Sequence, residues 1–320
     1  MAVYTNITLD ELNEFLQFYS LGTADELIGI KSGIENTNYL VKINNKKYIL
    51  TLFEKRTHQE DLPFFFELMN HLNSSGIKCP QAIKSKDNKY FKLLKDKPAS
   101  FTSFVSGEIL SRIEPNHCYE LGKSMALFHN ASSTLKISRN NQMGFENFGT
   151  LIKKLEVKNF KSEDVPIKLI KDEYKFLKEN ISFNLPKGII HADLFPDNVF
   201  FENNCLSGII DFYFSCNDYY AYEIAICINA WCFEENSNEF NISKAKKLLS
   251  SYNQVRELTK EEINSLPLFS RAAALRFLLT RLIDYFRETN DSLLVKKDPS
   301  EYIKKLNFHQ SVSKSSEYGL

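Results

Sequence analysis

Alternation of apolar and polar residues dominates the first hundred residues of the chain. Apolar side chains at every second position are typical of strands that bury one face. The predicted strands are 27–30, 38–43, 47–53, 88–94 and 99–105. Asn44-Asn45-Lys46 separates the second strand from the third and favours a tight hairpin turn. The pattern therefore predicts an antiparallel sheet that ends near Ser106-Gly107.

Helical spacing surrounds and follows this sheet. Thr8 and Glu11 predict a capped helix that stops at Leu21-Gly22, and Pro63 begins a second helix over 62–72. Beyond the sheet the predicted helices are 118–129, 167–185, 222–233, 243–252, 260–265 and 267–288, and the tail 311–320 is expected to fray. The fold class is therefore α+β, with an N-terminal sheet lobe over 1–105 and a mainly helical lobe over 106–320.

Composition and charge exclude several classes of protein. The 320 residues contain 43% hydrophobic residues, which is typical of a folded chain, and 40 Lys plus Arg balance 40 Asp plus Glu. This balance gives no electrostatic reason to expect nucleic acid or a membrane surface as a partner. No apolar run approaches the ~20 residues of a membrane helix, and the N-terminus does not resemble a signal peptide.

The six cysteines show no Cys-x-x-Cys pair. They read as reduced thiols, which predicts a cytoplasmic location, and their spacing does not favour structural zinc. The sequence leaves the oligomeric state open.

A polar loop between two apolar runs carries the candidate chemistry. His191, Asp193 and Asn198 follow the run 188–190, and Asp211 ends the run 206–210. Transfer of a phosphoryl group from ATP requires oxygen ligands for Mg²⁺ and a carboxylate that positions the attacking hydroxyl. Asp193 has the position of that carboxylate, and Asn198 and Asp211 have the positions of metal ligands. An Asp-Asn loop is by itself often only a turn, but His191 and Asp211 favour the phosphoryl-transfer interpretation.

The segment before the second strand is a candidate phosphate-binding hairpin. Gly33 and Asn36 lie there, although a plain β-turn explains the same residues. Phe104, near the end of the fifth predicted strand, lies where a crossing strand would face the adenine.

Strings along the whole chain carry a family resemblance. They are 1–5, 33–39, 48–56, 61–65, 190–201, 225–233 and 273–281. The chain resembles the aminoglycoside phosphotransferase and choline kinase-like superfamily, and within it the bacterial homoserine kinases. This resemblance implies a protein-kinase-like bilobal fold and ATP- and Mg²⁺-dependent phosphorylation of the side-chain hydroxyl of homoserine. It also implies that Asp193 is the catalytic base.

The chain departs from the superfamily on the third strand. Thr51 stands where a Lys or Arg usually reaches the phosphates, and Lys55 or Arg56 is the expected substitute, with a solvated basic pair as the competing interpretation. Asp211-Phe212-Tyr213 lacks the glycine of Asp-Phe-Gly, and Glu223-Ile224-Ala225 replaces the usual Asp-Leu-Ala.

Homoserine requires a group that binds its carboxylate. Arg276 or Arg281 is the candidate, in competition with an ordinary salt bridge. His191 and Asn229 are expected to line the same site, whereas Trp231 and His129 are expected to pack in the core. The alternatives are a kinase for choline, ethanolamine, methylthioribose or an aminoglycoside, and a nucleotide-binding pseudokinase-like module.

Overall fold

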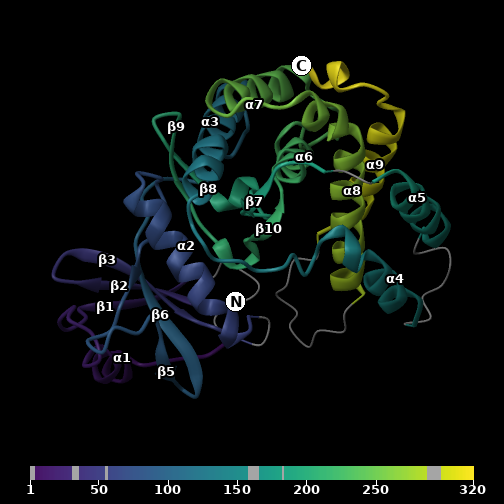
Figure 1. The fold of residues 1–320 in the computed structure, drawn as a ribbon. Helices are drawn as coiled ribbons and strands as arrows, with labels where there is room; N and C mark the ends of the chain where they lie inside the picture. The colour runs from purple at the N-terminus through teal and green to yellow at the C-terminus, as the bar shows by residue number, and fades with distance from the viewer. Residues whose placement is uncertain (1–3, 31–35, 55–56, 158–165, 182–183, 287–296) are drawn as a thin grey trace. The chain divides into compact units, whose positions relative to one another are not determined.

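The chain forms two compact units. The computed structural model describes residues 4–30, 36–54, 57–157, 166–181, 184–286 and 297–320 (Figure 1). The first unit consists of Met1–Gly107 with Ser207–Tyr213, and the second of Glu108–Leu206 with Phe214–Leu320. A short piece of chain carrying Asp211 therefore returns to the first unit after the second has begun.

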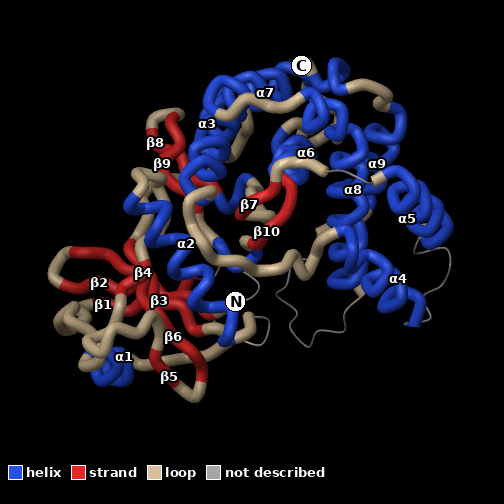
Figure 2. Tube along the Cα trace, in the orientation of Figure 1, coloured by secondary structure: helices blue, strands red, loops and turns tan. Residues whose placement is uncertain are grey.

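An antiparallel sheet builds the first unit. Its strand order is β1-β2-β3-β6-β4, and β5 pairs with β6 (Figure 2). The strands are β1 (Glu26–Ile30), β2 (Thr37–Ile43), β3 (Lys46–Leu52), β4 (Ala82–Ile83), β5 (Lys92–Leu94) and β6 (Lys97–Ser103). Between β2 and β3, Asn44 and Asn45 have φ of 48° and 64°. These left-handed residues make the two-residue turn that Asn44-Asn45 predicts, and Ile43 pairs with Lys46 across it.

The strand predicted over 88–94 is wrong in its first half. Only Lys92–Leu94 forms a strand. Asn88 has a φ of 62°, its N–H donates to Ser85 O at 2.8 Å, and the Ser85 hydroxyl donates to Asp87 Oδ1 at 2.6 Å. These local bonds favour a turn over an extended chain.

Two helices belong to the first unit. Helix α1 (Leu9–Leu16) has the predicted capping box between Thr8 and Glu11, but it ends earlier than Leu21. Its Leu12, Phe15 and Leu16 pack with buried strand residues such as Phe101 in one hydrophobic core. Helix α2 (Leu62–Ser74) has Pro63 in its first turn, as predicted, and is followed by Gly76 with a φ of 82°.

Helices make up most of the second unit. They are α3 (Pro115–Ser132), α4 (Phe148–Val157), α5 (Ile167–Asn180), α6 (Tyr220–Trp231), α7 (Ile242–Val255), α8 (Lys260–Tyr285) and α9 (Ser300–Ser311). Short strands pair as β7 (Lys187–Ile190) with β10 (Cys216–Tyr219), and as β8 (Val199–Glu202) with β9 (Cys205–Ile209). Helix α6 is almost entirely buried and packs on α8, which also packs on α9 (Figure 1).

Helix α8 corrects the prediction of two separate helices over 260–265 and 267–288. It continues through Pro267, which has no N–H to donate to the carbonyl of Ile263. The hydroxyl of Ser315 donates to that carbonyl instead. A side chain far along the sequence thus replaces the missing helical bond.

The C-terminal tail corrects the prediction that 311–320 is frayed. Residues Ser315–Tyr318 form a 3₁₀ turn, and Tyr318 is fully buried. The Tyr318 hydroxyl lies 2.8 Å from Nδ1 of His309, on the previously unpredicted helix α9. An aromatic anchor therefore holds the end of the chain against the helices.

Candidate active site

The loop that follows β7 contains a strained residue. Ala192 has a φ of 65°, although it is not a glycine. A left-handed residue of this kind costs on the order of 1–3 kcal/mol, and such strain concentrates at functional sites. Ala192 lies between His191 and Asp193, so its conformation sets the direction of the Asp193 side chain.

A buried carboxylate on α6 holds this loop. Glu223 Oε1 accepts the N–H of Ala192 at 2.6 Å, and Oε2 accepts the N–H of His191 at 2.9 Å. The sequence marked Glu223 only as a departure from Asp-Leu-Ala. Its role depends on a contact between residues about thirty positions apart, which the spacing of the motif does not reveal.

His129 pairs with the same carboxylate. Its Nε2 lies 2.9 Å from Glu223 Oε2, and its Nδ1 lies 2.7 Å from the hydroxyl of Tyr252. Burial lowers the pKa of His129 against the opposing effect of Glu223. Burial alone would raise the pKa of Glu223, but bonding to His129 outweighs it and holds that pKa below its ordinary value. The pair is therefore a neutral imidazole that donates to a carboxylate, which confirms His129 as a core residue.

Two further side chains fix the carbonyls of the loop. Arg276 Nη1, from the middle of α8, donates to Ala192 O at 2.7 Å. Trp231 Nε1, from the end of α6, donates to Leu194 O at 2.8 Å. Trp231 is fully buried, as expected for a core residue. Helices α6 and α8 thus supply a rigid mount for the loop.

Asp193 and Asn198 are in direct contact. The Asn198 side-chain amide donates to Asp193 O at 2.8 Å and to Asp193 Oδ2 at 3.1 Å. Because the nitrogen makes both of these bonds, the amide oxygen of Asn198 is directed away from Asp193. No hydrogen bond to that oxygen occurs within the described ranges, so it is available as a metal ligand.

Asp211, in the first unit, has a second strained backbone. Its φ is 62°, and the 3₁₀ turn Phe212–Phe214 follows it. The ring of Tyr213, which occupies the glycine position, packs edge-on against Phe53 and Phe65 at 5.1 and 5.5 Å between centroids. Packing of Tyr213 thus anchors the turn that presents Asp211.

Three of the predicted nucleotide-binding residues lie in or near the sheet, and the other two are not described. Gly33 and Lys55 lie outside the described residues, as does Arg56. Thr51 donates to Asn38 Oδ1 at 2.7 Å across the β2–β3 pair. Its hydroxyl supplies no positive charge.

Asn36 and Phe104 are also placed in the first unit. Asn36 Oδ1 accepts the backbone N–H of Glu54 at 3.2 Å. Phe104 is partly exposed, with the Lys47 ammonium 5.2 Å from its ring centroid. Their roles in nucleotide binding stay predictions.

The predicted substrate-binding residues divide into two groups. His191 and Arg276 belong to the loop and its mount, and both are buried. Asn229 is buried, and its amide bonds to Ala225 O, Ser270 O and His309.

Arg281 forms an ion pair with Glu301 and bonds to Asp298 O. The structure thus brings Arg276 to the catalytic loop, whereas it engages Arg281 with α9.

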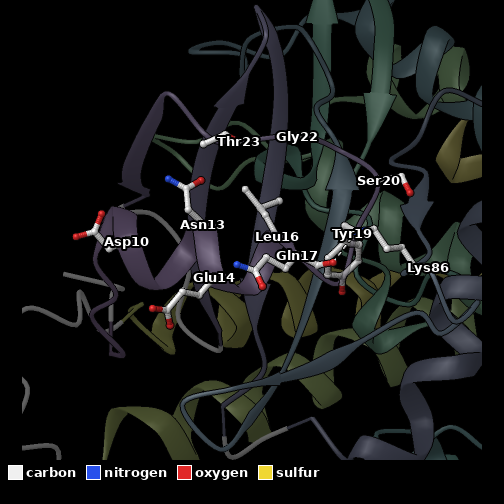
Figure 3. A pocket seen from close by; sticks show the side chains of 10 residues that line it. All are labelled: Asp10, Asn13, Glu14, Leu16, Gln17, Tyr19, Ser20, Gly22, Thr23 and Lys86. Atoms are coloured by element: carbon white, nitrogen blue, oxygen red, sulfur yellow. Dashed lines mark hydrogen bonds between the residues drawn. The ribbon is translucent and has the colours of Figure 1, made fainter.

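A separate shallow pocket lies on α1 and the segment after it. It has a volume of about 680 Å³ and is lined by Asp10, Glu14, Tyr19 and Lys86 among others (Figure 3). None of the predicted site residues lines it.

Comparison with known proteins gives the family. Residues 26–258 match the phosphotransferase enzyme family. The chain belongs to the phosphotransferase enzyme family. It is 47% identical to a homoserine kinase of Sinorhizobium medicae, over all of this chain and 98% of that one. It is 45% identical to a homoserine kinase of Agrobacterium fabrum, over all of this chain and 99% of that one.

A solved structure confirms the fold class. The amicoumacin kinase hAmiN, in complex with AMP-PNP, Ca²⁺ and Ami, matches with a TM-score of 0.71 at 14% identity. The match covers 93% of this chain and 91% of that one. The predicted α+β, protein-kinase-like fold, with an antiparallel sheet unit and a helical unit, is therefore correct.

Two negative findings apply to the described residues only. None of their helices combines the length and the apolar composition needed to cross a membrane. They also contain no group of three or more His, Cys, Asp or Glu side chains that could hold a metal ion.

Proposed function

We propose that this chain transfers the γ-phosphoryl group of ATP to the side-chain hydroxyl of L-homoserine. Relatives named homoserine kinase match the whole chain at 43–47% identity. The carrying geometric observation is the bonding of Asn198 to Asp193 on a loop that Glu223, Arg276 and Trp231 hold. Such a mount suits phosphoryl transfer, in which the protein contributes mainly positioning and electrostatics.

Asp193 aligns the hydroxyl of homoserine and accepts its proton. The hydroxyl oxygen forms a bond to the γ-phosphorus, and the bond from that phosphorus to the bridging oxygen of ADP breaks. Asp193 needs one carboxylate oxygen for this task, and its Oδ2 already accepts from Asn198. That bond limits rotation of the carboxylate before the substrate arrives.

Asn198 and Asp211 are the proposed ligands of Mg²⁺. The donor set fits a hard cation, because it offers an amide oxygen and a carboxylate, and Mg²⁺ usually completes its shell with water and phosphate oxygens. When bound, the ion neutralises charge on the phosphates. The left-handed backbone at Asp211 and the amide orientation of Asn198 keep both side chains in place.

The first unit is the proposed nucleotide-binding part. Gly33, Asn36, Thr51, Lys55 and Phe104 are its proposed contacts, with the predicted boundary at residue 105. The proposed cation for the phosphates is Lys55, with Arg56 as the alternative, since Thr51 is neutral. The proposed location is the cytoplasm, which suits six free cysteines.

The second unit is the proposed acceptor-binding part, over 106–320. His191, Asn229, Arg276 and Arg281 are its predicted contacts. Arg276 is the best candidate for the homoserine carboxylate, because it is buried beside the loop and no acidic side chain of the described chain pairs with it.

A panel of acceptors tests this function. Purified protein is incubated with ATP and Mg²⁺ and, separately, homoserine, choline, methylthioribose or kanamycin, and ADP release is measured. We expect homoserine to give the highest kcat/KM and chelation of Mg²⁺ to stop turnover. A preference for choline, methylthioribose or kanamycin would support the alternative small-alcohol kinase. Nucleotide binding with no turnover on any acceptor would support the pseudokinase-like module.

A further inference from the structure

Arg276 differs from the other arginines on its helix. Arg271 makes a two-point ion pair with Glu173, at 2.7 Å for each nitrogen, and Arg281 pairs with Glu301. Arg276 is 2% exposed, its Nη1 donates to Ala192 O, and its Nε lacks a partner within the part of the chain that the structure describes. Burial raises the pKa of the neighbouring Tyr222, and the charge and hydrogen bonding of Arg276 oppose that rise. This buried guanidinium therefore has a donor to spare and forms no ion pair with an acidic side chain of the described residues.

Asp218 on β10 is the opposite case. Its Oδ2 accepts from the Asn141 amide at 2.6 Å, and its Oδ1 accepts the N–H of Tyr219 at 2.7 Å. No Lys or Arg of the described residues lies within 4.0 Å of this carboxylate. Each carboxylate oxygen can accept a second hydrogen bond. Asp218 therefore holds a fixed orientation, with acceptor capacity to spare and no direct counter-ion.

Both side chains belong to elements that adjoin the catalytic loop: Asp218 pairs with Gly188, three residues before His191, and Arg276 bonds to the loop itself. Burial raises the pKa of Asp218, and the charges of Lys187 and Arg276 oppose that shift from a distance. Burial raises the pKa of the Cys216 thiol, two residues before Asp218. The charge of Asp218 adds to this shift, and the charge of Arg276 opposes it. Strand β10 pairs with β7, which leads directly into His191, and Arg276 bonds to Ala192.

The arrangement offers charges that complement the two charges of an α-amino acid. A partly or fully buried charge is costly unless a ligand of opposite charge joins it. A zwitterion that brings its carboxylate to Arg276 and its ammonium to Asp218 satisfies both side chains at once. Choline and aminoglycosides carry no carboxylate, so they would leave Arg276 unpaired.

We propose that Asp218 recognises the α-ammonium group of the acceptor and so determines specificity for an amino acid over an amine-free alcohol. The inference rests on the proposed function and extends it to a residue that the sequence did not mark. Asn141 and the N–H of Tyr219 orient the carboxylate, and the ammonium donates to its remaining lone pairs.

The test compares homoserine with 4-hydroxybutanoate, which has the same hydroxyl and carboxylate but no amino group. kcat/KM is measured for both acceptors with the wild type, Asp218→Asn and Asp218→Ser. The Asn variant keeps the size of the side chain, and the Ser variant is a second small polar replacement. Where 4-hydroxybutanoate turns over too slowly, its Ki against homoserine gives the same comparison.

We expect the two Asp218 variants to lose roughly 10- to 150-fold in kcat/KM for homoserine, the range of one charge-assisted hydrogen bond. The kcat/KM for 4-hydroxybutanoate should change by less than about threefold, because this acceptor has no ammonium group to bind the Asp218 carboxylate. The KM for ATP should stay unchanged. The ratio of kcat/KM for homoserine to kcat/KM for 4-hydroxybutanoate should therefore fall.

Two controls separate recognition from structural damage. Asn141→Ala removes a hydrogen bond to Asp218 but keeps its charge, so it should retain most of the preference for homoserine. Asp172→Asn removes an exposed carboxylate from α5 and should match the wild type.

Equal losses on both acceptors in the Asp218 variants would overturn the assignment of Asp218 and leave the proposed function intact. An inactive wild type with homoserine would instead overturn the proposed function.

Discussion

Replacement of Glu223 by Gln tests whether the mount of the catalytic loop controls activity. The carboxylate accepts three hydrogen bonds, from Ala192 N–H, His191 N–H and His129 Nε2–H. A glutamine has one acceptor oxygen, so its NH₂ group must face at least one of these donors. The variant loses a charge-assisted hydrogen bond, and one buried N–H then faces the NH₂ group instead of an acceptor. The unfolding free energy should therefore fall by about 2–4 kcal/mol.

The loss of activity should exceed what this loss of stability explains. The Ala192 peptide is held in a left-handed conformation by Glu223 on its N–H side and Arg276 on its C=O side. Without the first bond the peptide can relax, and Asp193 moves with it. Since a misplacement of about 1 Å can cost a factor on the order of 100, kcat should fall roughly 10- to 100-fold.

Glu173→Gln is the matched control. Glu173 is also a buried carboxylate of the second unit, with bonds from Arg271 and Gln310, but it does not contact the loop. Both variants are unfolded in urea and assayed by coupled ADP release below the onset of unfolding. We expect both to lose stability and only Glu223→Gln to lose kcat. A Glu223→Gln enzyme with the kcat of Glu173→Gln would refute the reasoning.

Two further predictions concern stability. Burial lowers the pKa of His309 to about 3. Between pH 6.5 and 3 this histidine is therefore protonated in the unfolded chain but neutral in the folded one. As the pH falls through that window, His309 should lower the unfolding free energy by about 1.4 kcal/mol per pH unit. His309→Gln should lack that contribution in urea titrations at several pH values, and an unchanged slope would contradict it. Ser315→Ala should cost about 1 kcal/mol, because Ile263 O loses its donor. The cost should shrink in a Pro267→Ala background, where the new N–H bonds to that carbonyl, and equal costs in both backgrounds would be evidence against this account.

Local patterns predicted most of the sheet and the chemistry of the loop. The two-residue period found four strands, because each buries one face, and the Asn44-Asn45 pair identified the hairpin from its tolerance of left-handed backbone. The residues of the loop singled out Asp193 and Asn198 as candidate site residues, and the structure adds that a 3₁₀ turn, Pro196–Asn198, brings the two into contact. These features depend on residues close in sequence.

Features that depend on distant residues were missed or misjudged. Glu223 and Arg276 hold opposite sides of the Ala192 peptide from two different helices. The tail looked unstructured because its order depends on Tyr318 packing near His309 and on Ser315 bonding to α8. No periodicity within the segment itself encodes such contacts.

The central claim is that Asp193 aligns the hydroxyl of homoserine for phosphoryl transfer. Its most direct test is the turnover number of Asp193→Ala with ATP, Mg²⁺ and saturating homoserine, alongside its melting temperature. We predict that kcat falls roughly 10²- to 10⁴-fold, the usual contribution of a positioned base, while the melting temperature stays close to that of the wild type. A folded Asp193→Ala enzyme that turns over homoserine at the wild-type rate would contradict the account.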